Sequence, residues 1–191
     1  EVEPEYKETL LARMDSKDLA KILEEMPTDE AADAIQDLSE HKRNQVLRRL
    51  GVEKVKTLSQ LTSYKEDIAG GLMTTEYMTI PQECNVAEAI ETIRQKSEDF
   101  HSVYHVYVLD NEGRVKGVVS IRTLLLADNA TPVQSLMAKV IKTVRTSTKA
   151  KEVAKHMTKY NLLSMAVVDR NKKLQGIVTV DDILRYLVPN A

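Results

Sequence analysis

Two kinds of hydrophobic pattern divide the chain. In residues 5–62 apolar side chains recur three and four positions apart, as at Leu19, Ile22, Leu23 and Met26, and no stretch alternates as a strand would. We predict short helices here, linked by turns of two or three residues and stacked as helical hairpins. After residue 71, short β-branched runs typical of strands alternate with helical stretches.

The second part of the chain contains a tandem repeat. Residues 117–125 (GVVSIRTLL) have a near copy at residues 176–184 (GIVTVDDIL), and residues 106–110 (VYVLD) match residues 165–169 (MAVVD). The repeat is roughly 60 residues long, a length typical of a small structural unit. In each copy the pattern predicts a strand, a helix, two strands joined by a tight turn, and a final helix.

These patterns predict an α+β protein. We expect an all-α helical-hairpin domain at residues 1–64 and a linker at 65–71, followed by β-α-β-β-α units at 72–132 and 133–191. Gly70 and Gly71 mark the linker, because glycine permits backbone angles that other residues avoid.

Composition narrows the function. Residues 1–69 hold 11 Lys+Arg and 16 Asp+Glu, and residues 70–191 hold 16 and 13, so the first part is acidic and the second mildly basic. Neither part has the dense basic patch with aromatic residues that nucleic-acid binding requires, so we predict no nucleic-acid partner. The P-loop, zinc-protease and serine-hydrolase motifs are absent, and we predict no enzyme.

The chain offers no segment for a membrane and no disulfide. Its apolar runs are a few residues long, too short to cross a bilayer. Cys84 is the only cysteine and cannot form an internal disulfide. The acidic opening without Met indicates that the sequence is a piece of a longer chain.

An acidic stripe is the first candidate for chemistry. Residues 24–40 contain seven Asp and Glu and no Lys or Arg, and Asp29, Asp33 and Asp37 follow at i, i+4 and i+8. Like charges at this spacing destabilise a helix by a few tenths of a kcal/mol per pair, a cost that a divalent cation would remove. Mg²⁺ prefers oxygen ligands and often contacts only one or two carboxylates. The alternative is an ordinary solvated face.

A second acidic pair, Asp181 and Asp182, follows the last strand of the second repeat and opens its final helix. The plain interpretation is helix capping and stabilisation of the helix dipole. A ligand site is the alternative.

The repeat resembles the cystathionine-β-synthase (CBS) domain, which usually occurs in pairs. Residues 69–77 (AGGLMTTEY), together with the helices before them, resemble the cytosolic part of MgtE-type magnesium transporters. The resemblance covers nearly the whole chain. It implies a homodimer through the CBS units, on the cytoplasmic face of the cell membrane. It also implies a transmembrane domain farther along the same full-length chain.

The resemblance also implies site residues. In this family, acids matching Asp29 and Asp33 hold Mg²⁺ at the boundary with the CBS pair, and the residue matching Asp182 faces the helical domain. At two further positions where the family has an acidic residue, this chain has Arg185 and Asn161 instead. Other acidic residues of the family pattern match positions after residue 191. Fewer or weaker magnesium sites are therefore expected than in the full pattern.

An adenine nucleotide is the alternative ligand, with ATP the expected form. In CBS domains a residue matching Asp182 can hold a ribose hydroxyl, with Thr179 near phosphate. The first repeat has Ser120 but carries Thr123 where the ribose-binding acid would stand. Three tyrosines are candidates to stack on the base: Tyr104, Tyr107 and Tyr160.

We therefore expect the chain to be the magnesium-sensing regulatory part of a transporter or channel. The CBS pair with the acidic stripe would close on Mg²⁺ and so gate the pore. The alternatives are an adenine-nucleotide sensor and a structural dimerisation module.

Overall fold

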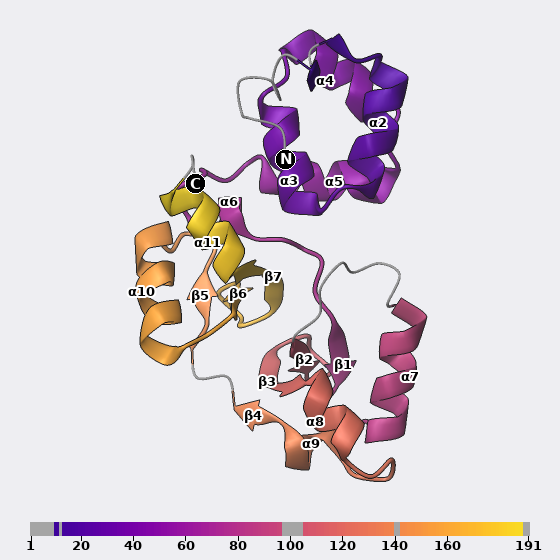
Figure 1. The fold of residues 1–191 in the computed structure, drawn as a ribbon, viewed down its shortest axis with the longest axis vertical. Coiled ribbons are helices and arrows are strands. Elements are labelled where there is room, and N and C mark those ends of the chain that lie inside the picture. Colours follow the sequence, from indigo (N-terminus) through magenta and orange to yellow (C-terminus); the bar gives the residue numbers. More distant parts are fainter. Residues whose placement is uncertain (1–9, 12, 97–104, 140–141, 189–191) are drawn as a thin grey trace. The chain divides into compact units, whose positions relative to one another are not determined.

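The computed structural model describes residues 10–11, 13–96, 105–139 and 142–188. The chain divides into two compact units, Glu1–Glu66 and Asp67–Ala191. The first unit is helical and the second contains two small sheets with helices around them, which confirms the predicted α+β class (Figure 1).

The helices of the helical unit begin at regular intervals of 12 residues. Its described helices are α2 (Ser16–Glu25), α3 (Thr28–Gln36), α4 (Glu40–Leu47) and α5 (Val52–Leu61), and their N-caps lie at positions 15, 27, 39 and 51. Helix α2 packs on α4 and α3 packs on α5. Each helix thus contacts its second neighbour most closely, whereas a helical hairpin would pair consecutive helices.

Two lysines at equivalent positions of this interval tie alternate turns together. Lys42 Nζ donates to the carbonyl of Met14, and Lys54 Nζ donates to the carbonyl of Met26 at 2.6 Å. The carbonyls that end a helix lack partners within it, so each lysine satisfies one of them. Leu23 and Ile35, which are twelve positions apart, are both buried, as this spacing implies.

The second unit contains two β-α-β-β-α repeats, as predicted. The first comprises β1 (Thr79–Pro81), α7 (Val86–Lys96), β2 (His105–Leu109), β3 (Val115–Ser120) and α8 (Ile121–Leu126). The second comprises β5 (Val144–Arg145), α10 (Ala150–Tyr160), β6 (Ser164–Val168), β7 (Leu174–Thr179) and α11 (Val180–Leu187). In each, the first strand pairs parallel to the second, and the second pairs antiparallel to the third.

The repeats exchange the segments that precede them. Helix α6 (Ala69–Leu72) lies against the second repeat, where Ala69 N–H donates to the carbonyl of Thr148 at 2.7 Å and Thr74 pairs with Ile177. Helix α9 (Val133–Leu136) and β4 (Ala138–Lys139) lie against the first repeat, where β4 extends the sheet beside β3.

The exchange depends on two glycines. A Cβ built at Gly117 would lie 2.7 Å from Met137 Sδ, and one built at Gly176 would lie 2.8 Å from Met73 Cγ and from the carbonyl oxygen of Thr74. These glycines open the repeated strand motif because any side chain there would collide with the exchanged segment.

Residues 65–71 differ from the predicted linker. Gly70 and Gly71 lie inside α6, and Gly70 N–H donates to the carbonyl of Thr146 at 2.8 Å. Hydrogen bonds to the second repeat therefore stabilise a four-residue helix that its own sequence would not favour.

The two sheets meet at their hairpins. Tyr107 is 3% exposed, packs with Ala166 and Leu174, and its hydroxyl lies 2.9 Å from Ser164 Oγ. Burial raises the pKa of the Tyr107 phenol, and the hydrogen bond with Ser164 partly offsets this.

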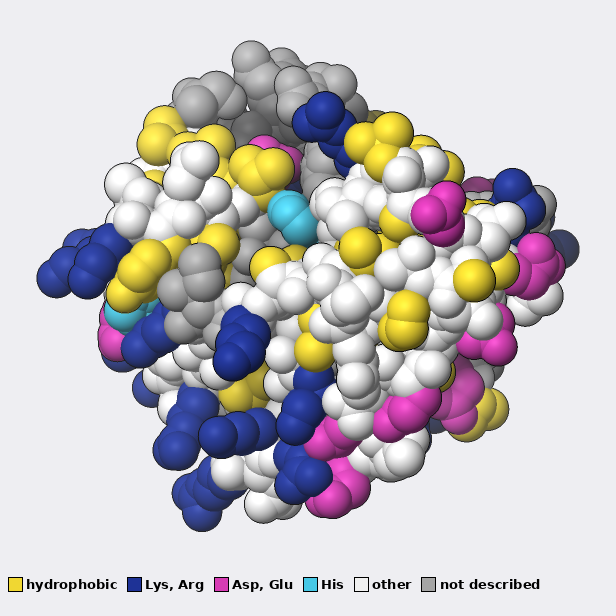
Figure 2. Space-filling model, turned by 90° about the horizontal axis from the view of Figure 1, so that it is seen from below, with side chains coloured by type: hydrophobic (Ala, Val, Ile, Leu, Met, Phe, Trp, Pro, Cys, Tyr) yellow, Lys and Arg dark blue, Asp and Glu magenta, His cyan; other side chains and the backbone are white. Residues whose placement is uncertain are grey.

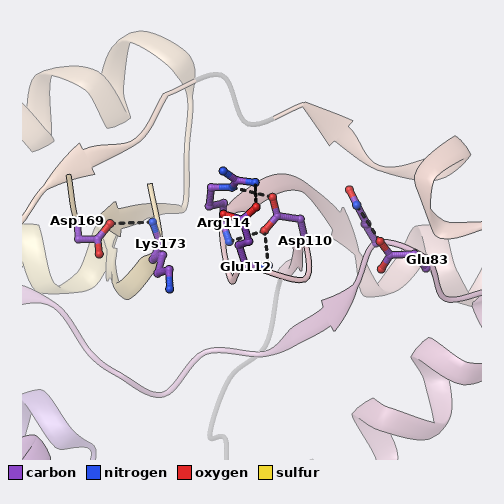
Figure 3. A network of polar contacts seen from close by, with 7 residues as sticks. Glu83, Asp110, Glu112, Arg114, Asp169 and Lys173 are labelled. Carbon is purple, nitrogen blue, oxygen red and sulfur yellow. Dashed lines mark hydrogen bonds and ion pairs between the residues drawn. The ribbon is translucent and has the colours of Figure 1, made fainter. Parts of the chain in front are cut away.

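The hairpin turns also contact each other through their backbones. Figure 3 shows Asp110, Glu112 and Arg114 of the first turn joined by polar contacts. Leu174 N–H donates to the carbonyl of Gly113 at 3.2 Å. The backbones of Arg114 and Lys173 form an isolated antiparallel β-bridge. Asp110 Oδ1 accepts from the backbone N–H of Arg114 at 2.9 Å, and this bond, followed by the Arg114 side chain, holds the pKa of Asp110 below its usual value.

Candidate functional site

The acidic stripe lies on α3 as the sequence predicts. Asp33 and Asp37 are exposed and Asp29 is partly exposed, while Ala31, Ala34 and Ile35 face the core. Asp29 lies in the first turn of the helix, one residue after its start at Thr28, and Asp37 is its C-cap residue. The three carboxylates therefore line the outer face of α3 along its whole length.

The two ends of α3 differ electrostatically. Asp29 and Glu30 stand in the first turn, where a helix favours negative charge. Asp37 stands at the other end, where negative charge is unfavourable. The Arg43 guanidinium occupies the carbonyls there, with Nε donating to Ile35 O and Nη2 to Gln36 O, both at 3.0 Å.

Asp182 forms a capping box at the start of α11. Its Oδ2 accepts from Thr179 N–H at 2.8 Å and from Thr179 Oγ1 at 2.7 Å, and its own N–H donates to Thr179 Oγ1 at 3.3 Å. The capping role predicted as the plain interpretation is therefore present. It also holds the carboxylate in one orientation at the strand-to-helix turn, with Asp181 exposed beside it.

The first repeat has the same turn without the acid. Ser120 Oγ accepts from Thr123 N–H at 3.0 Å and lies 2.8 Å from Thr123 Oγ1. A neutral hydroxyl thus replaces the carboxylate of Asp182, so this turn lacks a charged ligand for a cation and a strong acceptor for ribose hydroxyls.

The tyrosine candidates occupy different environments. Tyr107 lies in the contact between the two sheets, so stacking its ring on an adenine would require the sheets to part. Tyr160 stacks on His156 with ring centroids 6.4 Å apart. Tyr104 lies outside the described residues.

Within the described residues of each unit, the structure shows no complete metal centre. Among the residues that the structure describes, no three His, Cys, Asp or Glu side chains gather closely enough to hold a metal. Asp29, Asp33 and Asp37 belong to the helical unit, and Asp181 and Asp182 belong to the second unit. These are oxygen donors, the type that Mg²⁺ prefers, and Mg²⁺ retains water in the positions that protein does not fill.

A hollow on the helical unit was not anticipated from sequence. It has a volume of about 510 Å³ and is lined by Asp15, Ser16, Gln45, Arg48 and Arg49. Its residues come from α2 and α4, or border them, and only the 12-residue spacing would have placed them together. Because the hollow is lined by one carboxylate and two guanidinium groups, its charges favour neither an anionic nor a cationic ligand clearly.

Family models match both units. The MgtE intracellular N domain matches residues 1–67, and the CBS domain matches residues 66–129 and 133–189. In the described ranges no helix combines the length and the apolar character needed to cross a bilayer.

Curated relatives include magnesium transporters. The magnesium transporter MgtE of Thermus thermophilus is 43% identical over 131 residues, which cover 69% of this chain and 29% of that protein. The magnesium transporter MgtE of Bacillus subtilis is 29% identical over 191 residues, which cover all of this chain and 42% of that protein. The chain spans less than half the length of either relative.

Solved structures share the fold. The crystal structure of the soluble part of a magnesium transporter matches with a TM-score of 0.91 and 30% identity, covering 98% of this chain and 73% of the other. The cytosolic domain of the Mg²⁺ channel MgtE in complex with ATP matches with a TM-score of 0.83 and 34% identity, covering 94% and 78%.

Proposed function

Because the chain belongs to the MgtE magnesium-transporter family, carrying its intracellular N domain and CBS domains, we propose that it senses magnesium and regulates a transporter pore. The pore would belong to a membrane domain of the same full-length protein. The chain would then work at the cytoplasmic face of the membrane, as a regulator without catalytic activity.

The acidic stripe of α3 is the observation that carries the proposal. Three aspartates share the outer face of one short helix whose other face is fully used in packing. Without a cation these carboxylates repel one another, and they also repel any other acidic surface brought close to them.

In the proposed mechanism Mg²⁺ joins the two units. Asp29 and Asp33 would supply ligands from α3 and Asp182 from the start of α11, with Asp37 and Asp181 adding negative charge. Mg²⁺ shifts the equilibrium toward the closed arrangement only by its higher affinity for that arrangement. A site with few carboxylates and several waters is expected to have a Kd on the order of 10⁻⁴–10⁻³ M. Closure would shut the pore when magnesium is abundant.

A homodimer is part of the proposal. The last helix of each repeat has two exposed leucines, namely Leu125 (67%) and Leu126 (77%) on α8, and Leu184 (53%) and Leu187 (44%) on α11. Such large apolar side chains on two equivalent helices favour an interface between CBS pairs of two copies.

ATP is the second candidate ligand. The solved relative in complex with ATP favours it, and Thr179 with Asp182 offers a fixed hydroxyl and carboxylate in the second repeat. Thr123 in the first repeat and the burial of Tyr107 argue for weak binding at one turn only.

Titration calorimetry separates these ligands. We expect Mg²⁺ to bind with a Kd on the order of 10⁻⁴–10⁻³ M, and Asp29→Asn/Asp33→Asn to abolish the heat signal. Glu53→Gln/Glu66→Gln removes the same charge elsewhere in the helical unit and serves as the control. Sub-micromolar ATP binding that Asp182→Ala abolishes, with no response to Mg²⁺, would instead establish a nucleotide sensor.

A further inference from the structure

A run of positive charge in the sequence leads into α10 and continues along it. Residues 138–160 contain seven of the chain's 27 Lys and Arg but only one of its 29 Asp and Glu. Figure 2 shows Lys and Arg side chains gathered along one side of the face that it presents. The concentration is local, because the chain as a whole has a net charge of −2.

Helix α10 arranges three of these charges in a line. Lys151, Lys155 and Lys159 are all exposed and follow at i, i+4 and i+8. Val153 and Met157 are buried on the opposite side. We call these three lysines the lysine stripe. It extends about 12 Å along the helix axis, from the rise of about 1.5 Å per residue.

Among the described residues, no acidic side chain forms an ion pair with a member of the lysine stripe. In the ranges that the structure describes, Lys151 and Lys155 form no ion pair, and Lys159 lies 5.2 Å from the centroid of the Tyr160 ring. Glu152, the one acid of the helix, lies 3.4 Å from His156 Nε2. Like charges at i, i+4 disfavour a helix, so an external anionic surface would remove a cost that the fold retains.

The shape of the surface indicates the partner. The lysine stripe lies on the convex outer side of a helix, which suits a flat array of anions better than one small ligand. Tyr160, which is partly exposed, and Leu163, which is 50% exposed, follow Lys159 in the sequence. Tyrosine and leucine beside lysine are typical of segments that lie at a bilayer interface.

We propose that the lysine stripe of α10 docks on the anionic phospholipid headgroups of the membrane. Each lysine near such a surface contributes favourably, and the attraction fades within a Debye length. The docking proposal rests on one part of the proposed function, namely that the chain works beside a membrane. It requires neither magnesium binding nor closure.

Vesicle co-sedimentation tests the proposal. The full chain, in EDTA and low salt, is mixed with vesicles of phosphatidylcholine alone or with about one third phosphatidylglycerol, a composition that mimics an anionic leaflet. We expect binding to the anionic vesicles only, and release when salt is raised to several times the physiological level.

The test variant and the control variant each lose three positive charges. Lys151→Gln/Lys155→Gln/Lys159→Gln keeps good helix formers and is expected to weaken binding about 100-fold, roughly fivefold per lysine. The control, Lys17→Gln/Lys56→Gln/Lys65→Gln, changes three exposed lysines of the helical unit and should leave binding unchanged. Circular dichroism confirms that both variants are folded.

Several results would overturn the proposal. They are absence of binding to anionic vesicles, equal binding to neutral ones, or equal loss in both variants. Displacement by inorganic phosphate at equal ionic strength would mean a small-anion site, and stronger binding to a DNA duplex would mean a nucleic-acid surface. In calorimetry, the lysine-stripe variant should bind Mg²⁺ as the wild type does. If the membrane proposal fails, the magnesium proposal can therefore still be tested separately.

Discussion

At the scale of single residues, equivalent turns of the two repeats share a backbone conformation with different side chains. Gly113 has φ +77° in the first hairpin, and Lys172 has φ +65° at the matching place in the second. A lysine in this left-handed region carries a steric cost of roughly 1–2 kcal/mol that glycine avoids.

We therefore expect Lys172→Gly to stabilise the CBS unit by up to about 1 kcal/mol, since part of the gain is lost to the greater freedom of glycine when unfolded. Urea unfolding followed by circular dichroism measures the change. Arg170→Gly, in the same turn without a positive φ, should destabilise instead. Equal shifts in both variants would contradict the explanation.

Tyr107 gives a pH dependence. Because burial raises the pKa of its phenol above the unfolded value of about 10, its contribution to stability is complete below that pH and is lost as pH rises toward the folded pKa. Tyr107→Phe should cost about 1 kcal/mol at pH 7, where the hydrogen bond with Ser164 is lost.

The same variant should be less sensitive than wild type to pH values above about 10, where the phenol would ionise. Urea midpoints at neutral and alkaline pH test this, with Tyr186→Phe on α11 as the control. An identical alkaline loss in wild type and Tyr107→Phe would show that this phenol is not responsible.

At the scale of elements, the exposed leucines of α8 and α11 argue for self-association. We expect Leu184→Glu/Leu187→Glu to convert a micromolar dimer to a monomer in sedimentation velocity, because a buried unpaired carboxylate is strongly unfavourable. Val52→Glu, at an exposed valine of the helical unit, is the control. A dimer that survives the double substitution would place the interface elsewhere.

The sequence predicts elements well wherever one period dominates. The β-branched apolar runs of the strands and the repeat of the motif at Gly117 and Gly176 led directly to two β-α-β-β-α units. The exchange of α6 and β4 between the repeats could not be predicted, because long-range hydrogen bonds and glycine contacts decide it. Helix α6 shows this most clearly, since two adjacent glycines indicate a flexible segment by themselves.

The helical unit shows a second limit. Its apolar spacing predicted helices correctly, but the pairing of α2 with α4 and of α3 with α5 depends on the 12-residue interval between caps. That interval is visible at Asp15 and Ser39 and obscured at Pro27 and Gly51, which offer no side-chain cap. The acidic stripe of α3 was predictable because it needs only the helical period.

At the scale of the whole molecule, the proposed function requires Mg²⁺ to draw the acidic helical unit toward the CBS unit. Asp29 and Asp33 would meet Asp182, and their mutual repulsion would be replaced by shared coordination of the ion. A simple screening effect would instead depend on ionic strength and not on which cation supplies it.

Small-angle scattering of this chain in EDTA and in about 10 mM Mg²⁺, above the expected affinity range, tests the claim most directly. The radius of gyration should fall with Mg²⁺ in the wild type and in Glu53→Gln/Glu66→Gln, and should stop responding in Asp29→Asn/Asp33→Asn. An unchanged radius, or the same compaction with K⁺ at equal ionic strength, would contradict the magnesium-sensing account.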